Sequence, residues 1–145
     1  LVPNYWNSND HALMLEMFDA LDAGVFGDAS TDRMYATGIS SGGYMTSRMA
    51  LADPGRFRAL AIAAGSYATC AGPLCDVGAI PADHPPTLFL HGALDPIVPL
   101  FTMDAYRNKL NQNGLETRRV VDLFATHEWI PPSAPDVVGW FMAHP

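Results

Sequence analysis

Ser40 lies in a short glycine-rich stretch whose residue types suit nucleophilic chemistry. Residues 38–42 read Gly-Ile-Ser-Ser-Gly, the pattern G-x-S-x-G. In this pattern the glycines leave room for a sharp turn between a strand and a helix, and the turn exposes the serine hydroxyl. The neighbouring residues fit, because residues 33–37 predict a strand and residues 44–51 predict a helix. We therefore predict that Ser40 is a nucleophile; the alternative is a small residue needed only by a tight turn.

Two more polar side chains follow predicted strands later in the chain. Residues 87–92 form an apolar segment of strand length, and Asp95 comes shortly after it. Residues 117–124 form another, and His127 follows. Catalytic groups collect at the carboxyl ends of parallel strands, so we expect these side chains to lie near Ser40. A serine hydroxyl needs a histidine to take its proton, and an aspartate holds that imidazole in the productive tautomer. The chain order is thus nucleophile, acid, base.

Other residues compete for these roles. Asp122 and Asp136 are rival acids, and the alternative role for Asp95 is to cap the turn before Pro96. The remaining histidines are less well placed, in a helix, a proline-rich segment, a strand end and the last residues: His11, His84, His91 and His144. For the strand-end histidine a structural role is the simplest prediction. The backbone N–H of Ser41, at the expected start of the helix, would face the oxyanion formed when a carbonyl is attacked.

The elements that must position these residues alternate along the chain. Apolar residues at helical spacing predict helices after Ser8 and after Pro99, and a last short helix over residues 136–142. Residues 57–65 predict a buried strand, and residues 66–86 predict a long irregular segment rich in proline and glycine. This alternation predicts an α/β layered fold with a mostly parallel sheet.

Composition narrows the functional classes. The 145 residues, 49% of them hydrophobic, predict a single domain over residues 1–145. Fifteen acidic residues against eight basic ones argue against a nucleic-acid partner, and no apolar run reaches the length of a membrane span. The first residues lack the basic and apolar regions of a signal peptide, so the start is expected to be cut or processed. Cys70 and Cys75 form either a local disulfide or two reduced thiols, and no histidine close in sequence completes a zinc-ligand set.

Three segments resemble the α/β-hydrolase serine esterases, within them the group of polyhydroxybutyrate depolymerases, feruloyl esterases and acetylxylan esterases. Residues 38–45, Gly-Ile-Ser-Ser-Gly-Gly-Tyr-Met, are similar to that group's nucleophile turn. Residues 91–99, His-Gly-Ala-Leu-Asp-Pro-Ile-Val-Pro, resemble its H-G-x-x-D-x-x-V-P acid loop and point to Asp95. His127-Glu128-Trp129 is similar to the H-x-W after the last strand, although Thr126 stands where glycine is frequent. The resemblance implies a substrate-binding role for Trp129; the alternative is an ordinary core or surface aromatic.

The resemblance implies a three-layer α/β-hydrolase-like sandwich and a serine hydrolase that cleaves carboxylic esters without a metal or organic cofactor. Its substrate would be a polyhydroxyalkanoate-type polyester or a short-chain, feruloyl or acetyl ester, and it would be secreted or periplasmic. A thioesterase or acyltransferase with the same triad remains an alternative. The family's usual first strands and the loop with the second oxyanion donor have no counterpart in the sequence. We therefore also expect an exposed sheet edge, and a second copy of the chain is a candidate to cover it. The alternative function is a catalytically impaired fragment or an interaction module.

Overall fold

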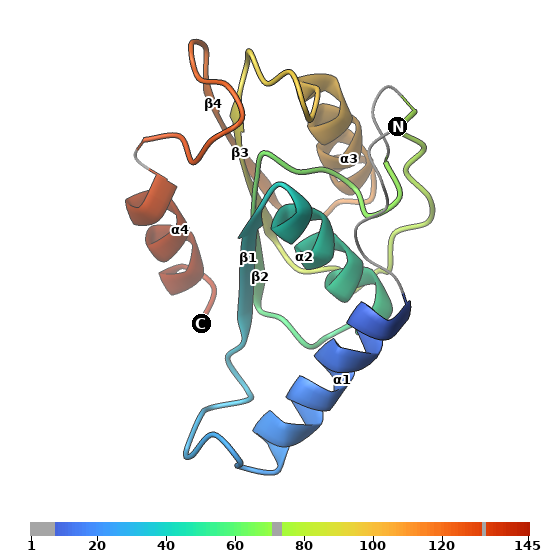
Figure 1. The fold of residues 1–145 in the computed structure, drawn as a ribbon, viewed down its shortest axis with the longest axis vertical. Coiled ribbons are helices and arrows are strands. Elements are labelled where there is room, and N and C mark those ends of the chain that lie inside the picture. Colours follow the sequence, from blue (N-terminus) through green and yellow to red (C-terminus); the bar gives the residue numbers. More distant parts are fainter. Residues whose placement is uncertain (1–7, 71–73, 132) are drawn as a thin grey trace.

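The computed structural model describes residues 8–70, 74–131 and 133–145. A four-stranded parallel sheet forms its middle layer (Figure 1). The strands lie in the order of the sequence: β1 (Tyr35–Ile39), β2 (Ala59–Ala63), β3 (Thr87–Gly92) and β4 (Thr117–Asp122). Each neighbouring pair is parallel, so all four carboxyl ends meet at one edge of the sheet.

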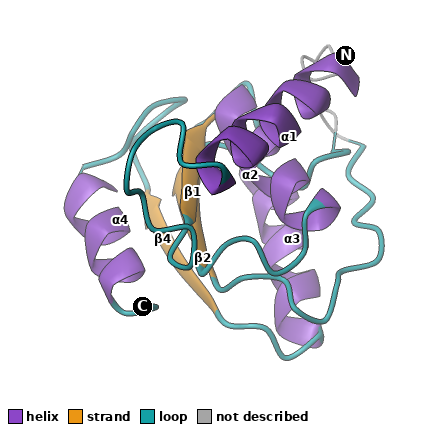
Figure 2. Ribbon diagram, turned by 90° about the horizontal axis from the view of Figure 1, so that it is seen from below, coloured by secondary structure: helices purple, strands orange, loops and turns teal. Residues whose placement is uncertain are grey.

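Helices cover both faces of this sheet. One face carries α1 (Ser8–Asp22), α2 (Ser41–Ala52) and α3 (Leu100–Gln112), and α4 (Ser133–Met142) covers the other (Figure 2). The arrangement confirms the predicted α/β layered fold. Among the described residues, no helix combines the length and the apolar character needed to cross a membrane.

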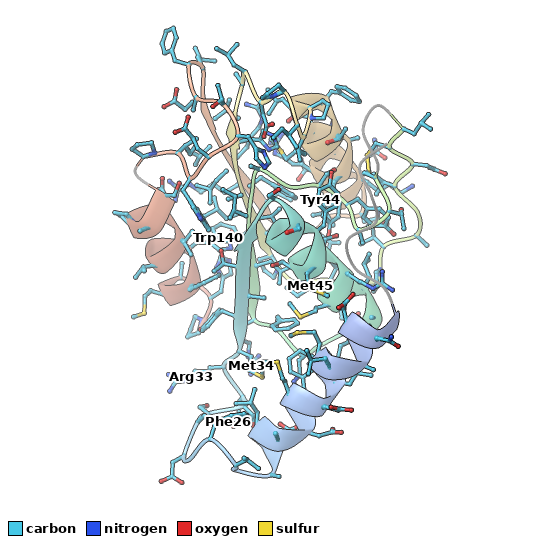
Figure 3. The ribbon with its side chains drawn as sticks, viewed as in Figure 1. Phe26, Arg33, Met34, Tyr44, Met45 and Trp140 are labelled. Carbon is cyan, nitrogen blue, oxygen red and sulfur yellow. A yellow bond between two sulfur atoms is a disulfide. The ribbon has the colours of Figure 1, made fainter. Side chains whose placement is uncertain are left out.

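The two central strands supply the core to both layers because their side chains alternate between the faces. On the α4 side, small and branched residues pack against Trp140 (Figure 3): Ala59, Ala61, Ala63, Leu88 and Leu90. On the other side, Leu60 packs with Met45 of α2 and Phe18 of α1, and Ile62 and Phe89 pack with α3. Burial of one such large apolar side chain contributes about 1.5–3 kcal/mol. This double burial explains why β2 reads as a continuous apolar run.

Several boundaries differ from the sequence prediction. The strand expected over residues 33–37 spans Tyr35–Ile39, because Gly38 and Ile39 stay extended and pair with β2. Helix α2 begins at Ser41, not at residue 44, and the helix expected from residue 136 begins at Ser133. That last helix includes Pro135, which is tolerated because the first turn of a helix needs no backbone N–H donor there. Strand β3 has the predicted bounds.

Strand β1 has a sheet neighbour on one side only among the described strands. This agrees with the expectation of an exposed edge, since an edge strand leaves part of its backbone unpaired within the sheet. Whether a second copy covers the edge stays a prediction, as does the single-domain organisation.

Candidate active site

Ser40 occupies a strained turn between β1 and α2. Its φ is 55° and its ψ is −121°, a backbone conformation that residues with a Cβ rarely adopt. Such strain costs on the order of 1–3 kcal/mol and persists where the surrounding structure enforces it. Here the Ser40 backbone N–H donates to the carbonyl of Ala63 on β2, and the Ser40 carbonyl accepts from the N–H of Tyr44. The turn is therefore tied both to the sheet and to the helix that follows.

Glycines allow this turn to close. A Cβ at Gly38 would lie 2.4 Å from the backbone carbonyl atoms of Gly42, a distance that no real side chain tolerates. A Cβ at Gly43 would lie 3.1 Å from the carbonyl oxygen of Ala63. The first glycine lets the strand and the first turn of α2 touch, and the other lets α2 lie close to β2. Gly38 of the sequence pattern and the neighbouring Gly43 thus have a direct steric cause, whereas a Cβ at Gly42, the other glycine of the pattern, would meet open space.

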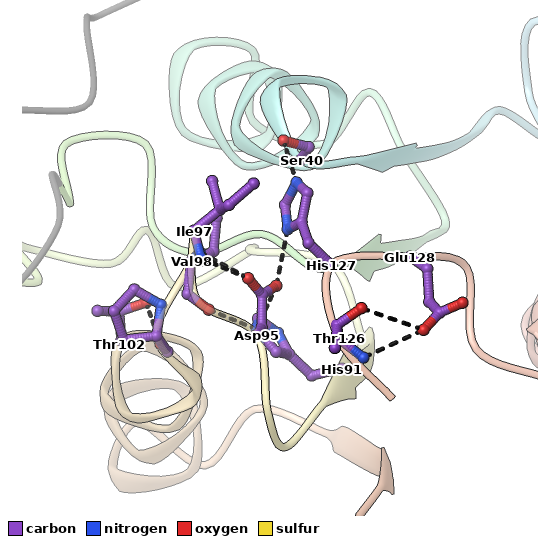
Figure 4. A network of polar contacts seen from close by, with 10 residues as sticks. Ser40, His91, Asp95, Ile97, Val98, Thr102, Thr126, His127 and Glu128 are labelled. Atoms are coloured by element: carbon purple, nitrogen blue, oxygen red, sulfur yellow. Dashed lines mark hydrogen bonds and ion pairs between the residues drawn. The ribbon is translucent and has the colours of Figure 1, made fainter. Parts of the chain in front are cut away.

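The three residues predicted for the site lie in one hydrogen-bonded chain (Figure 4). His127 Nε2 is 2.8 Å from Ser40 Oγ, and His127 Nδ1 is 2.8 Å from Asp95 Oδ2. The carboxylate accepts from Nδ1–H, which leaves the Nε2 lone pair for the serine hydroxyl. This tautomer is the one in which the imidazole can take a proton from Ser40.

Asp95 is buried, and both its oxygens have partners. Oδ1 accepts the backbone N–H groups of Ile97 and Val98 at 2.8 and 2.9 Å, while Oδ2 faces His127. The side chain itself has no solvent exposure. Because a buried carboxylate is costly unless it is hydrogen-bonded, these donors offset part of the cost of burying Asp95 beneath the histidine.

Two titratable side chains close to Asp95 are held neutral. Burial raises the pKa of the Tyr44 phenol, and the negative charge of Asp95 raises it further. Burial lowers the pKa of the His91 imidazole. Neither group therefore places a full charge beside the carboxylate at neutral pH.

A close backbone approach joins the loops that carry the acid and the base. A Cβ at Gly92 would lie 2.2 Å from the carbonyl oxygen of Thr126 and 2.4 Å from that of Ala125. The Leu94 N–H also donates to the Ala125 carbonyl at 3.0 Å. Gly92 therefore lets the His127 loop settle on the end of β3. The sequence motif contains this glycine, but no local pattern predicts its role, which depends on a contact between distant segments.

The rival residues have other partners. Asp122 Oδ1 accepts the backbone N–H groups of Phe124 and Ala125, and Asp136 pairs with Arg118 at 2.8 Å. His84 is buried against Tyr106, and its Nε2 lies 2.6 Å from the phenol oxygen. None of these contacts involves Ser40.

The remaining predictions concern Ser41, Trp129 and the cysteines. Ser41 is the first residue of α2, beside the nucleophile, where helix amides point toward the N-terminal end. Trp129 lies on the His127 loop and is 44% exposed. Their oxyanion and substrate roles stay predictions. Cys70 and Cys75 form a disulfide, the first of the two alternatives. Within the described residues, no group of three or more His, Cys, Asp or Glu side chains is arranged to hold a metal ion.

The chain is similar to several known hydrolases. The prolyl oligopeptidase family profile matches residues 5–71. A poly(3-hydroxyoctanoate) depolymerase from Pseudomonas fluorescens is 51% identical over the whole chain, which corresponds to 52% of that relative's length. A probable feruloyl esterase C from Aspergillus terreus is 33% identical over 75% of the chain and 38% of its own length. The chain thus spans about half, or less, of the length of these relatives.

The solved structure of a thermostable esterase superposes with a TM-score of 0.73 and 22% identity, over 94% of this chain and 37% of that one. At this identity the likeness concerns the fold. Together with the parallel sheet and the strained Ser40 turn, it shows that the chain has the α/β-hydrolase fold.

Proposed function

We propose that the protein is a serine hydrolase of carboxylic esters in which Ser40 is the nucleophile, His127 the base and Asp95 the acid. The observation that carries the proposal is the hydrogen-bonded chain from Ser40 Oγ through the imidazole to the buried carboxylate. The relatives support it, because one is named a depolymerase and another an esterase.

The reaction follows from the positions of the polar atoms. Ser40 Oγ attacks the ester carbonyl carbon while its proton passes to His127 Nε2. The resulting oxyanion would be stabilised by the backbone N–H of Ser41. The imidazolium then gives its proton to the leaving alcohol as the C–O bond breaks, which leaves Ser40 acylated. Water attacks this acyl-enzyme, with His127 again as the base, and releases the carboxylic acid and the free serine.

The surface around the site favours an apolar substrate. The loops that carry Asp95 and His127, with the start of α3, expose six large apolar side chains: Leu94, Ile97, Phe101, Leu123, Phe124 and Trp129. Large exposed apolar side chains on loops that carry catalytic residues are candidates for contact with a substrate. We therefore propose a polyhydroxyalkanoate-type polyester as the substrate, in agreement with the name of the Pseudomonas relative. Release of 3-hydroxyoctanoate from its polyester should exceed release of ferulate or acetate from their esters; the reverse order would contradict this choice.

The catalytic proposal is tested with a soluble nitrophenyl ester. Removal of the nucleophile in Ser40→Ala should lower kcat by about 10⁶-fold, because triad members act as one unit. Ser30→Ala, at an exposed loop serine, is the matched control and should keep the wild-type rate. Equal rates for wild type and Ser40→Ala would favour the alternative of an impaired fragment or interaction module. A thioester with the same acyl chain, assayed in parallel, separates ester hydrolysis from thioester hydrolysis.

The disulfide also bears on location. Disulfides persist in oxidising compartments, so the bond between Cys70 and Cys75 supports our proposal that the protein works outside the cell or in the periplasm.

A further inference from the structure

His91 is a buried histidine that the proposed reaction does not use. It lies next to the end of β3, four residues before Asp95, and its side chain has no solvent exposure. Burial of an imidazole is costly, because the ring must find partners for its polar nitrogens or leave them unsatisfied. Its contacts therefore indicate what the burial achieves.

The contacts of His91 define its protonation. Nε2 lies 2.8 Å from the carbonyl oxygen of Val98, which can only accept, so Nε2 carries the proton and donates it. Nδ1 is buried and has no hydrogen-bond partner among the described residues. A proton on Nδ1 would be an unsatisfied buried donor, so the ring is the neutral Nε2–H tautomer. The lowering of the His91 pKa by burial agrees with this.

Val98 is hydrogen-bonded to both His91 and Asp95. The N–H of Val98 donates to Asp95 Oδ1 at 2.9 Å, while the carbonyl of Val98 accepts from His91. Nε2 of His91 is in addition 3.4 Å from Asp95 Oδ2, the oxygen that faces His127. The imidazole thus connects β3 to the far end of the turn that carries the carboxylate (Figure 4).

We propose that His91 is a positioning residue for Asp95: its Nε2–H fixes the turn over residues 95–98 so that Oδ2 stays directed at His127 Nδ1. A carboxylate on an unfixed turn would keep its charge but lose its alignment. Misplacement of a catalytic group by about 1 Å typically costs on the order of 100-fold in rate. The inference rests on the proposed function for its consequence in catalysis, whereas its structural part concerns the Asp95–His127 hydrogen bond alone.

Two amide substitutions separate positioning from packing. In His91→Gln the side-chain amide reaches as far as the imidazole Nε2 and can still donate to Val98. In His91→Asn the same amide is one methylene shorter and cannot reach. Both are neutral and polar, so they differ chiefly in the donor that the proposal requires. His84→Asn is the control, because His84 is equally buried but contacts Tyr106 and Pro85 and not the triad.

Two readouts are measured on each folded variant. The first is kcat and KM with a soluble nitrophenyl ester. The second is the NMR resonance of the proton shared by His127 Nδ1 and Asp95, assigned by its loss in Asp95→Asn. We expect His91→Asn to lose about 100-fold in kcat with little change in KM and to lose or broaden the resonance. His91→Gln should keep most of both, and His84→Asn should lower stability while it leaves both readouts near wild type.

Each outcome decides the question. Wild-type kcat and resonance in folded His91→Asn would overturn the proposal, and so would loss of both in folded His91→Gln. If His91→Asn fails to fold, the result with His91→Gln decides alone. If wild type shows the resonance but hydrolyses no ester, the proposed function fails, and the response of the resonance to the two amides still tests the role of His91.

Discussion

Replacement of Asp95 by asparagine tests the roles within the proposed triad, because the local hydrogen bonds fix how the new amide must lie. Two backbone N–H groups, from Ile97 and Val98, donate to Oδ1. The amide oxygen of Asp95→Asn must take that place, since an NH₂ group there would oppose two donors. The NH₂ group then faces His127 Nδ1, which must become an acceptor.

This reversal changes the tautomer of the base. With Nδ1 accepting, the proton of the neutral imidazole moves to Nε2, which lies 2.8 Å from Ser40 Oγ and can no longer take the serine proton. The same substitution in a serine protease triad lowers kcat by about 10⁴, equivalent to about 5.5 kcal/mol of barrier. We expect a loss of that size here, with KM little changed because the substitution is isosteric and buried.

The measurement is kcat with a soluble nitrophenyl ester, on protein whose fold is checked by circular dichroism. Asp122→Asn is the matched control: its Oδ1 accepts two backbone N–H groups in the same way, at the end of the neighbouring strand, without contact to a histidine. It should keep activity within a few-fold of wild type. A folded Asp95→Asn variant with more than a tenth of the wild-type kcat would refute the reasoning.

Three further predictions concern stability. Gly38→Ala would place its Cβ 2.4 Å from the backbone of the first turn of α2, so it should lower both the thermal midpoint and the activity. Gly139→Ala, in a helix and with open space around it, should raise the free energy of unfolding by up to about 1 kcal/mol. Equal effects of the two substitutions would contradict the steric argument. Burial lowers the pKa of His84 below its usual 6.5, so the unfolded chain binds more protons as pH falls through that value. Stability should therefore decline below about pH 6.5, with a weaker decline in His84→Asn, and denaturant midpoints that coincide for the two proteins at every pH would contradict this. Reduction of the Cys70–Cys75 disulfide, which closes a short loop, should lower the free energy of unfolding by about 2 kcal/mol. Denaturation with and without reductant measures this difference, and equal curves would show that the bond adds no stability.

The sequence predicted the layered fold because its signals are local. The apolar run of β3 is bounded by a proline pair and a glycine, and the structure has the same bounds. The sequence predicts a longer nucleophile turn than the structure has: the predicted strand ends two residues too early, at Thr37, and the predicted helix begins three residues too late, at Tyr44. In the structure Gly38 still pairs with Ile62, and the backbone bends only at Ser40. A glycine in a pattern does not reveal whether it permits a bend or a close contact.

The sequence predicts the residues of the candidate site but not the contacts that hold those residues in place. Ser40, Asp95 and His127 follow three strands, and parallel strands bring such residues together. The contact of Gly92 with the His127 loop joins segments more than thirty residues apart, and no local pattern encodes it. The link from His91 to Val98 was missed for a related reason, since the histidine reads as part of an apolar strand until the turn folds back over it.

The central claim is that Ser40 is an activated nucleophile, and covalent labelling tests it most directly. A fluorophosphonate reacts with a serine hydroxyl that an adjacent base activates, so intact mass and peptide mapping should find one adduct, on Ser40. Labelling should vanish in Ser40→Ala and slow greatly in Asp95→Asn. Folded wild-type protein that takes up no label, or that is labelled equally after Ser40→Ala, would contradict the account.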